Sequence, residues 1–188
     1  EHLSGGNGAR NYGFKMSQGG YIQWFDSDDL MVPEKLELKV KAMQENDVDF
    51  VVSKTKYFNA PNDIKDYEYD FKESDVNFES FTTTYISWFT PDLMVLRNKA
   101  LSIAFNEQLK SGQEFNFISK LLLTTCKLKL IKKHLTLRRY SGDSIGVKRR
   151  QNKSNYLSTT FYSSWTTFKE LYPLSNYNKK FGQKLLLK

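Results

Sequence analysis

The amino-acid sequence predicts an α/β domain in which helices flank a mixed, mainly parallel sheet, followed by a helical C-terminal tail. Apolar runs of strand length alternate with amphipathic stretches of helix length, which is typical of this fold class. One apolar run, residues 20–25, ends abruptly in three carboxylates, and buried strands of α/β proteins carry ligand-binding residues at this end. We expect a first domain over residues 1–145 and a basic, aromatic-rich tail over residues 146–188.

The individual elements follow from the spacing of apolar residues and from the residues that end each run. Within residues 33–45, Leu36, Val40 and Met43 recur at helical spacing and predict an amphipathic helix. Pro91 ends the helix expected at residues 78–86, because the residue before a proline avoids helical backbone angles. Further helices are expected at residues 9–18, 115–124 and 149–168, strands at residues 20–25, 48–53, 93–96, 128–131 and 135–140, and a turn at residues 132–134.

The length and composition indicate a globular domain with a substantial core. The chain has 188 residues, of which 39% are hydrophobic and 15% aromatic, and this excludes an intrinsically disordered protein. The single cysteine, Cys126, argues against a disulfide framework and favours a reducing compartment, so we expect a cytoplasmic protein. No run approaches the roughly eighteen apolar residues that indicate a membrane-spanning helix.

Charge is divided unequally along the chain. The formal net charge is +7, but the residues from Lys127 onward contain 15 Lys and Arg against 2 acids, whereas the preceding residues contain 13 against 19. A strongly basic segment suggests an anionic partner, and nucleic acid, anionic lipid headgroups and a lipid-linked phosphate are all candidates. The alternative is a solvated basic surface without a ligand.

The acidic motif Asp26-Ser27-Asp28-Asp29 is the strongest candidate for a functional site. Like charges at this spacing raise one another's pKa, a divalent cation would keep them ionised, and oxygen ligands favour magnesium, manganese or calcium over zinc. A solvated loop or a helix N-cap is the alternative. An EF-hand loop is excluded because Met31 stands where glycine is required. A phosphatase of the haloacid-dehalogenase kind would need a second acidic pair, for which Gly142-Asp143 is a weak candidate.

The acidic motif belongs to a longer pattern. An Ala-Arg-Asn-x-Gly segment, a Gly-x-Tyr-Ile strand start, the motif itself and a Pro-x-Lys-Leu-Glu helix start follow one another along the chain. This combination resembles family 2 glycosyltransferases of the GT-A fold over about residues 1–145. The matching residues are Ala9, Arg10, Asn11, Gly13, Gly20, Tyr21, Ile22, Asp26, Ser27, Asp28, Asp29, Pro33, Lys35, Leu36 and Glu37.

The resemblance implies a partial catalytic domain. In the family, a strand, a helix and a second strand precede the Ala-Arg-Asn segment and hold much of the nucleotide base, and this sequence begins after them. We therefore expect residues 1–145 to form an N-terminally truncated GT-A catalytic domain. Such a truncation would weaken nucleotide binding and could leave the chain as given inactive.

The same resemblance assigns the donor side of a site. It implies a nucleotide-sugar donor and a divalent metal, manganese or magnesium, bound at the acidic motif. Asp28 is predicted as the direct metal ligand, and Asp26 as a ligand of the ribose or the metal, with Ser27 between them. Arg10 is expected near the phosphate or base, because it lies close to a predicted helix start. Arg139 is expected at the diphosphate, because the guanidinium fork suits phosphate.

Glu114, Asp29 and Trp88 are the candidates on the acceptor side. The family places a catalytic carboxylate, usually the aspartate of a Glu-Asp pair, at a helix start after a Phe-x-Glu-x-Leu turn, and here the pair is Gln113-Glu114. Glu114 is therefore predicted as the general base for the acceptor hydroxyl, unless it only caps its helix. Trp88 is predicted as a sugar-stacking platform or as a core residue, and Asp29 as an acceptor neighbour.

These features together predict a metal-dependent, inverting glycosyltransferase of the hexosyltransferase type. The family implies an acceptor such as a growing surface polysaccharide or a lipid-linked glycan, and hence a role in bacterial polysaccharide biosynthesis. The alternative is a non-catalytic fragment or degenerate homologue that retains the fold as a binding module.

The basic tail predicts attachment to the inner face of a membrane. Basic residues precede aromatic residues at helical spacing, and this order favours a helix on an anionic membrane surface. In the alternative interpretation the aromatics pack on the catalytic domain. Nucleic acid is not expected as a partner, since packing explains the aromatics better than base stacking. The residues concerned are Lys148, Arg149, Arg150 and Lys153, then Tyr156, Phe161, Trp165 and Phe168.

Overall fold

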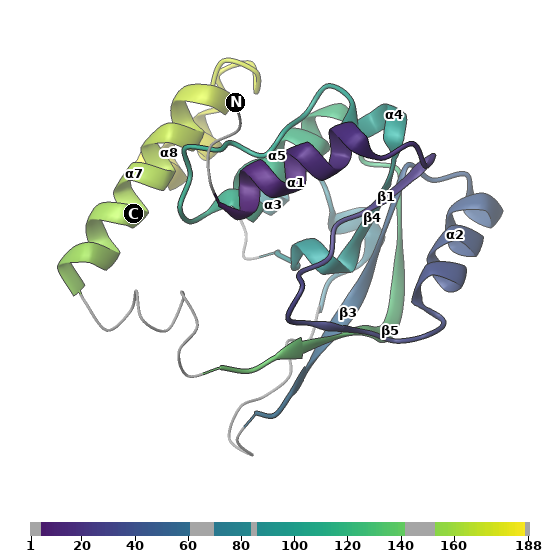
Figure 1. Ribbon diagram of the computed structural model, residues 1–188. Coiled ribbons are helices and arrows are strands. Elements are labelled where there is room, and N and C mark those ends of the chain that lie inside the picture. Colours follow the sequence, from purple (N-terminus) through teal and green to yellow (C-terminus); the bar gives the residue numbers. More distant parts are fainter. Residues whose placement is uncertain (1–4, 61–69, 84–85, 142–152, 187–188) are drawn as a thin grey trace.

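The computed structural model describes residues 5–60, 70–83, 86–141 and 153–186 (Figure 1). The helices are α1 (Gly6–Met16), α2 (Lys35–Asn46), α3 (Phe78–Thr83), α4 (Arg97–Ala100), α5 (Gln113–Thr124), α7 (Lys153–Leu171) and α8 (Lys179–Leu186). The strands are β1 (Tyr21–Gln23), β2 (Leu30–Met31), β3 (Phe50–Phe58), β4 (Leu93–Leu96) and β5 (Leu128–Arg139). Short 3₁₀ turns lie at η1 (Glu73–Asp75) and η2 (Thr90–Asp92).

The strands form a mixed sheet in the order β1-β4-β3-β5-β2. β3 runs parallel to β5, whereas β1 with β4, β4 with β3 and β5 with β2 pair antiparallel. The predicted mixed sheet is confirmed, but its mainly parallel character is wrong for the strands that the structure describes. Apolar runs identify strands without fixing their direction, which depends on connections that the pattern does not reveal.

β5 is one strand rather than the two predicted at residues 128–131 and 135–140. Its register against β3 shifts twice, between Val52 and Thr55. Shifts of this kind place extra residues on one strand as bulges, so the polar run 132–134 is accommodated without a reversal of the chain. Lys132 and Lys133 are exposed there. The charges that suggested a turn therefore lie on a bulged strand.

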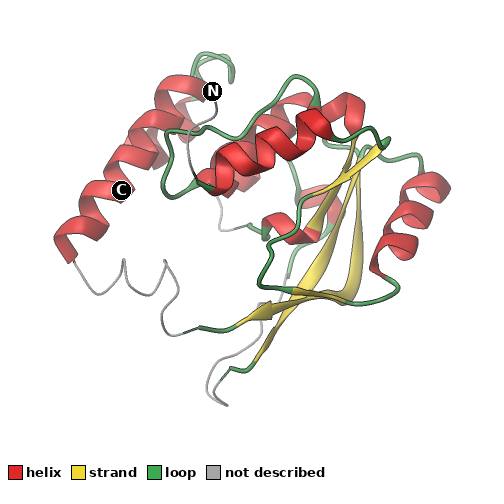
Figure 2. Cartoon of the chain, in the orientation of Figure 1, coloured by secondary structure: helices red, strands yellow, loops and turns green. Residues whose placement is uncertain are grey.

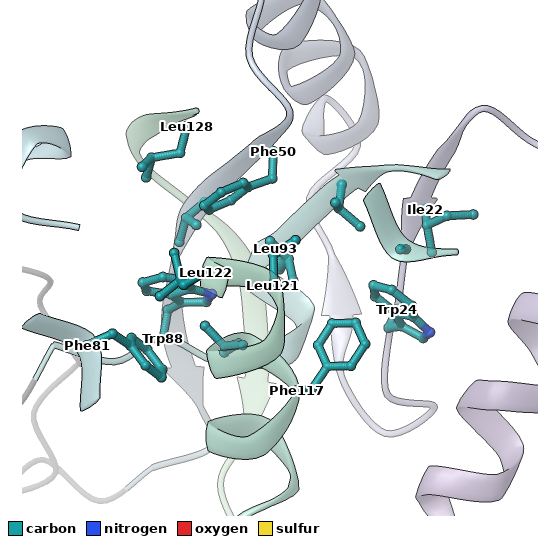
Figure 3. Packing of buried hydrophobic residues seen from close by; sticks show 14 of the residues in the cluster. Ile22, Trp24, Phe50, Phe81, Trp88, Leu93, Phe117, Leu121, Leu122 and Leu128 are labelled. Atoms are coloured by element: carbon teal, nitrogen blue, oxygen red, sulfur yellow. The ribbon is translucent and has the colours of Figure 1, made fainter. Parts of the chain in front are cut away.

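Helices cover both faces of the sheet (Figures 1 and 2). α2 covers one face, where Met43 packs with Val51 and Met94. The main core lies on the other face, between the sheet and α5 (Figure 3). There the rings of Phe105 and Phe117 stack with centroids 4.1 Å apart. This packing fixes α5 relative to the strands and so determines where its first turn lies.

The buried side of α2 differs from the predicted one. Leu36 keeps 45% of its surface exposed, whereas Lys35 and Lys39 are buried together with Met43. These three residues are spaced four apart and share one face of the helix. The hydrophobic pattern assigned the lysines to solvent, but their ammonium groups find oxygen acceptors inside the protein, as buried charges require.

The tail helices pack on the domain. Leu171 of α7 and Phe181 and Leu185 of α8 are buried against Phe78 and Phe115, and α8 was not predicted from the sequence. The expected domain boundary near residue 146 lies outside the described residues, as do Lys148, Arg149 and Arg150. Among the helices that the structure describes, none combines the length and apolar character needed to span a bilayer.

Candidate active site

The acidic motif lies in the loop that joins β1 to β2, which are the edge strands of the described sheet. The loop crosses one end of the sheet before β2 pairs with β5 (Figure 1). Asp29 N–H donates a hydrogen bond to Asp26 O at 3.3 Å, and Val32 N–H donates to Leu135 O at 3.3 Å. These bonds close the loop, so its carboxylates gather after the end of β1.

Arg10 and Asp26, both predicted at the donor, form an ion pair. Arg10 Nη2 lies 2.6 Å from Asp26 Oδ1, and the guanidinium lies 5.4 Å from the centroid of the Phe105 ring. α1 begins at Gly6, so Arg10 lies in its second turn and the predicted helix start at residue 9 is wrong. Arg10 therefore meets the motif through its side chain, without the N-terminal amides that were expected beside it.

Asp29 anchors the loop. Its side chain is buried, and Oδ1 accepts a hydrogen bond from the Arg139 N–H at 3.0 Å. Burial raises the pKa of Asp29, while the Arg139 N–H and the charge of Arg138 act in the opposite direction. The structure thus contradicts the predicted acceptor contact, because this carboxylate is turned inward to the backbone of β5.

Ser27 and Asp28 are the exposed members of the motif. Arg139 Nε donates to Asp28 O at 3.1 Å, and the guanidinium lies 4.9 Å from the centroid of the Phe58 ring. These contacts hold the end of β5 against the motif. The structure therefore brings together the predicted donor-side residues Asp26, Asp28 and Arg139, although their contact with a donor stays a prediction.

A cavity of about 570 Å³ lies between α1 and the chain from β1 to the motif. Its lining includes Arg10, Asp26 and Ser27 as well as the rings of Phe14 and Trp24. Small-molecule sites usually fall in the range of about 300–1,000 Å³ and combine apolar walls with a few polar groups. The size and lining of this cavity make it the candidate donor pocket.

Glu114 lies in the first turn of α5 and is bound to η2. Its Oε1 accepts hydrogen bonds from Thr90 N–H at 2.8 Å and from Thr90 Oγ1 at 3.0 Å. Gly112 precedes the helix with φ 70°, and no side chain caps this end by a hydrogen bond. The alternative interpretation, in which Glu114 stabilises its helix through the helix dipole, needs no such bond and fits a carboxylate in the first turn. The carboxylate is also held by Thr90, a residue 24 positions earlier.

Two asparagines of α1 hold the turn that leads to α5, a role that sequence reasoning missed. Asn11 donates to Phe105 O and Glu107 Oε1, each at 2.9 Å, and accepts from the Phe105 N–H. Asn7 donates to Asn106 O and to the carbonyl of residue 109, also at 2.9 Å. Positions four apart share one helix face. These two side chains therefore link α1 to the segment that presents Glu114.

A second link joins the acidic motif to the support of Glu114. The Arg138 guanidinium lies 4.3 Å from the centroid of the Phe89 ring. Phe89 directly precedes Thr90, which binds Glu114, and Arg138 directly precedes Arg139, which binds the motif. The contact between Phe89 and Arg138 thus connects the predicted donor and base residues.

Trp88 is a core residue. It keeps 3% of its surface exposed, and its ring lies 5.1 Å from Phe81 and 6.4 Å from Phe50, centroid to centroid (Figure 3). The structure therefore contradicts its use as a sugar-stacking platform and supports the alternative interpretation. A tryptophan beside a proline-containing turn is compatible both with a stacking platform and with a core residue. Its inward orientation depends on the neighbouring strands, which the local sequence does not reveal.

Asp26 and Asp28 are the carboxylates that could hold the expected metal. Asp26 is engaged by Arg10, and Asp28 is exposed. Within the described ranges, no group of three or more His, Cys, Asp and Glu side chains is arranged to hold a metal ion. Magnesium and manganese often use one or two protein carboxylates and complete their shell with water and substrate phosphate oxygens. Two carboxylates beside a diphosphate would be enough for such a metal, and its binding here stays a prediction.

Comparison with known proteins adds independent evidence. The model of the family described as "Glycosyl transferase family 2" matches residues 1–107. An uncharacterized glycosyltransferase of Methanocaldococcus jannaschii is 25% identical over 171 residues, which cover 88% of this chain and 57% of the relative. The Escherichia coli enzyme WfgD, named a UDP-Glc:alpha-D-GlcNAc-diphosphoundecaprenol beta-1,3-glucosyltransferase, is 34% identical over 59 residues, or 31% of this chain and 23% of that enzyme.

Solved structures show the same fold. Residues 1–349 of Staphylococcus aureus TarS in complex with UDP-GlcNAc superpose with a TM-score of 0.62 at 17% identity, covering 97% of this chain and 55% of that one. The TarS complex with UDP gives a TM-score of 0.58 at 17% identity, covering 82% of this chain and 43% of that one. The present chain therefore spans no more than 57% of the length of the relatives named here. The α/β domain has the predicted GT-A fold.

Proposed function

Because the chain belongs to glycosyl transferase family 2, we propose that it transfers a sugar, of hexose type, from a nucleotide-sugar donor to a glycan or lipid-linked acceptor. One observation carries this proposal. The contacts from Arg10 to Asp26, from Arg139 to Asp28 and Asp29, and from Thr90 to Glu114 gather donor-binding and base candidates around one end of the sheet.

The donor would bind in the cavity beside α1. Its rings and small residues suit a nucleoside, and Arg10 and the acidic motif at its edge suit the phosphates and ribose. The named donor of WfgD is UDP-Glc, and TarS is seen with UDP and UDP-GlcNAc. These relatives support a uridine diphosphate sugar as the first donor to test.

Asp28, with Asp26, would hold a manganese or magnesium ion. When bound, such a metal supplies Lewis-acid stabilisation of the departing diphosphate. The chain's own contribution is positional: Arg10 fixes Asp26, and Arg139 fixes the backbone of Asp28. The metal ligands would therefore be held before the donor arrives.

Glu114 would act as the general base. The acceptor hydroxyl oxygen attacks the anomeric carbon from the face opposite the diphosphate, the bond from that carbon to the diphosphate breaks, and the hydroxyl proton passes to Glu114. Attack from the opposite face inverts the anomeric configuration. The bonds from Thr90 hold one carboxylate oxygen, Oε1, so that Oε2 is the oxygen available to the acceptor.

The tail would bring the protein to an anionic membrane surface on which a lipid-linked acceptor lies. On α7, Leu157, Phe161 and Trp165 are spaced four apart and keep 54%, 69% and 40% of their surface exposed. An apolar stripe that follows basic residues along the chain suits the boundary between headgroups and acyl chains. The lipid-linked acceptor in the name of WfgD supports this proposal.

The test is transfer by the purified protein across a panel of nucleotide sugars, with and without manganese, using undecaprenyl-diphosphate-linked sugar and free oligosaccharides as acceptors. We expect one donor to give a glycosylated product and free nucleoside diphosphate only when the metal is present. Metal-dependent nucleotide binding without product or hydrolysis would support the alternative of a binding module. Absence of both binding and transfer would refute the proposal.

A further inference from the structure

α2 directs two lysine side chains into the protein, toward η2. Lys35 and Lys39 are fully buried, each with 0% of its surface exposed, although lysine is almost never buried without partners. Lys35 Nζ donates to Pro91 O at 2.8 Å, and Lys39 Nζ donates to Asp92 O at 2.7 Å. The two ammonium groups therefore hold consecutive backbone carbonyls of the same short turn.

The side chain of Asp92 completes a buried polar network. It is itself fully buried, and its carboxylate accepts hydrogen bonds from Thr55 Oγ1 at 2.8 Å and from Thr136 Oγ1 at 3.0 Å. Lys35 Nζ also donates to Thr136 Oγ1 at 2.7 Å. Residues from α2, β3 and β5 thus converge on η2, which is held from several sides by directional bonds.

Lys35 contacts both halves of the candidate site. Its Nζ lies 4.5 Å from the centroid of the Phe25 ring, and Phe25 directly precedes the acidic motif. Its acceptor Pro91 directly follows Thr90, whose N–H and hydroxyl hold Glu114. A single buried ammonium group therefore lies between the strand end that carries the donor residues and the turn that holds the base.

We propose that Lys35, supported by Lys39, is a positioning residue that sets the distance between the acidic motif and Glu114. The inference rests on the proposed function in so far as Glu114 is the base. An apolar side chain could fill the same space under α2, and replacing buried charges by apolar groups often leaves stability unchanged or higher. Directed bonds to the carbonyls of η2 are what the lysines add, and catalytic geometry is sensitive to shifts of about 1 Å.

The experiment compares Lys35→Met with the wild-type protein in two readouts. Amide hydrogen exchange reports η2 directly, because the Thr90 N–H is held by Glu114 and the Asp92 N–H by Phe89 O. We expect about tenfold faster exchange at Thr90 and Asp92 in the variant, with unchanged exchange at Val51 in the centre of the sheet. In the transfer assay, kcat should fall by about 10²-fold while the KM for the donor changes less than about twofold.

Lys99→Met is the matched control. Lys99 is partly buried and pairs with an acid, with Nζ 3.3 Å from Asp49 Oδ2. It follows β4 along the chain, whereas η2 precedes β4, so Lys99 and η2 lie at opposite ends of that strand. This control should keep the wild-type exchange at Thr90 and the wild-type kcat. If Lys35→Met does not fold, Lys39→Met gives the same comparison, because it removes the bond to Asp92 O.

The two proposals fail in different ways. The exchange measurement needs no substrate, so absence of transfer by the wild-type protein would count against the proposed function alone. Unchanged exchange at Thr90 in both lysine variants would overturn the positioning role. The same conclusion would follow if exchange accelerated equally at Thr90 and Val51, since the lysines would then act only on global stability.

Discussion

Replacing Lys35 by methionine should remove a rise in stability at alkaline pH. Burial lowers the pKa of Lys35 from 10.5 to about 8. Between these values the unfolded state binds a proton that the folded state does not, so the free energy of unfolding rises with pH. Below about pH 8 the lysine is protonated in both states, and it contributes no slope. Methionine does not titrate, so the variant should lack the rise.

The size of the effect follows from the same two pKa values. The whole window corresponds to about 3 kcal/mol, since one pH unit is worth about 1.36 kcal/mol. The free energy of unfolding is measured in urea at about pH 7 and about pH 9.5. This interval includes more than half of the window between the two pKa values, so the free energy of unfolding of the wild-type protein should rise by about 2 kcal/mol relative to that of Lys35→Met. Comparison at each pH removes the contributions of groups that both proteins share. Burial lowers the pKa of Lys39 and the charge of Lys35 lowers it further, so the series is repeated in a Lys39→Met background.

The reasoning would be refuted by parallel stability curves. If wild type and Lys35→Met differed by a constant amount from about pH 7 to about pH 9.5, Lys35 would titrate with an ordinary pKa in the folded state. The charges of Asp92 and Asp29, which oppose the effect of burial, would then offset it, and the argument from burial to a lowered pKa would fail. The test compares how the free energy of unfolding changes with pH in the two proteins. It can therefore still be made if the variant is less stable by several kcal/mol at every pH.

The remaining predictions concern the donor acids, the base and the tail. Asp28→Ala should weaken the manganese-dependent binding of UDP at least roughly tenfold, because an oxygen ligand is lost. Calorimetric titration measures this affinity, and an unchanged value would show that Asp28 is not part of the site. Glu114→Gln should keep donor binding and lower turnover by about 10²–10⁴-fold in the transfer assay, because an amide cannot take the proton. Glu114→Asp should keep activity. Normal turnover by the glutamine variant would contradict the assignment of Glu114 as the base. Phe161→Ser with Trp165→Ser should reduce co-sedimentation with anionic liposomes at low salt, and wild-type protein that stays in the supernatant would contradict membrane binding.

The sequence predicted those parts of the site whose residues lie close together along the chain. The acidic motif follows an apolar run at once, so its place after the end of β1 could be predicted from the run alone. Glu114 was placed at a helix start by the family resemblance, and the apolar residues from Phe115 predicted the helix itself, which begins two residues earlier, at Gln113. Local pattern was sufficient there because the local chain determines the position of the side chain.

The parts that failed depend on contacts between distant segments. The burial of Lys35 rests on a carbonyl 56 positions later, and the inward turn of Asp29 rests on an N–H 110 positions later. Trp88 turns inward because the neighbouring strands and helices surround it. A pattern read along one stretch records hydrophobicity and spacing, but it does not record which partner another segment supplies.

The disagreement between pattern and burial on α2 is itself informative about function. A sequence selected only for a stable core would place Leu36 inward and leave the lysines in solvent, because apolar side chains satisfy that position without a desolvation cost. The protein does the opposite: Leu36 stays exposed while Lys35 and Lys39 are buried under η2. Departures from local rules are expected where function requires them. Here the departure lies where the supports of the acidic motif and of Glu114 meet, and the turn held by these lysines is the one that fixes Glu114.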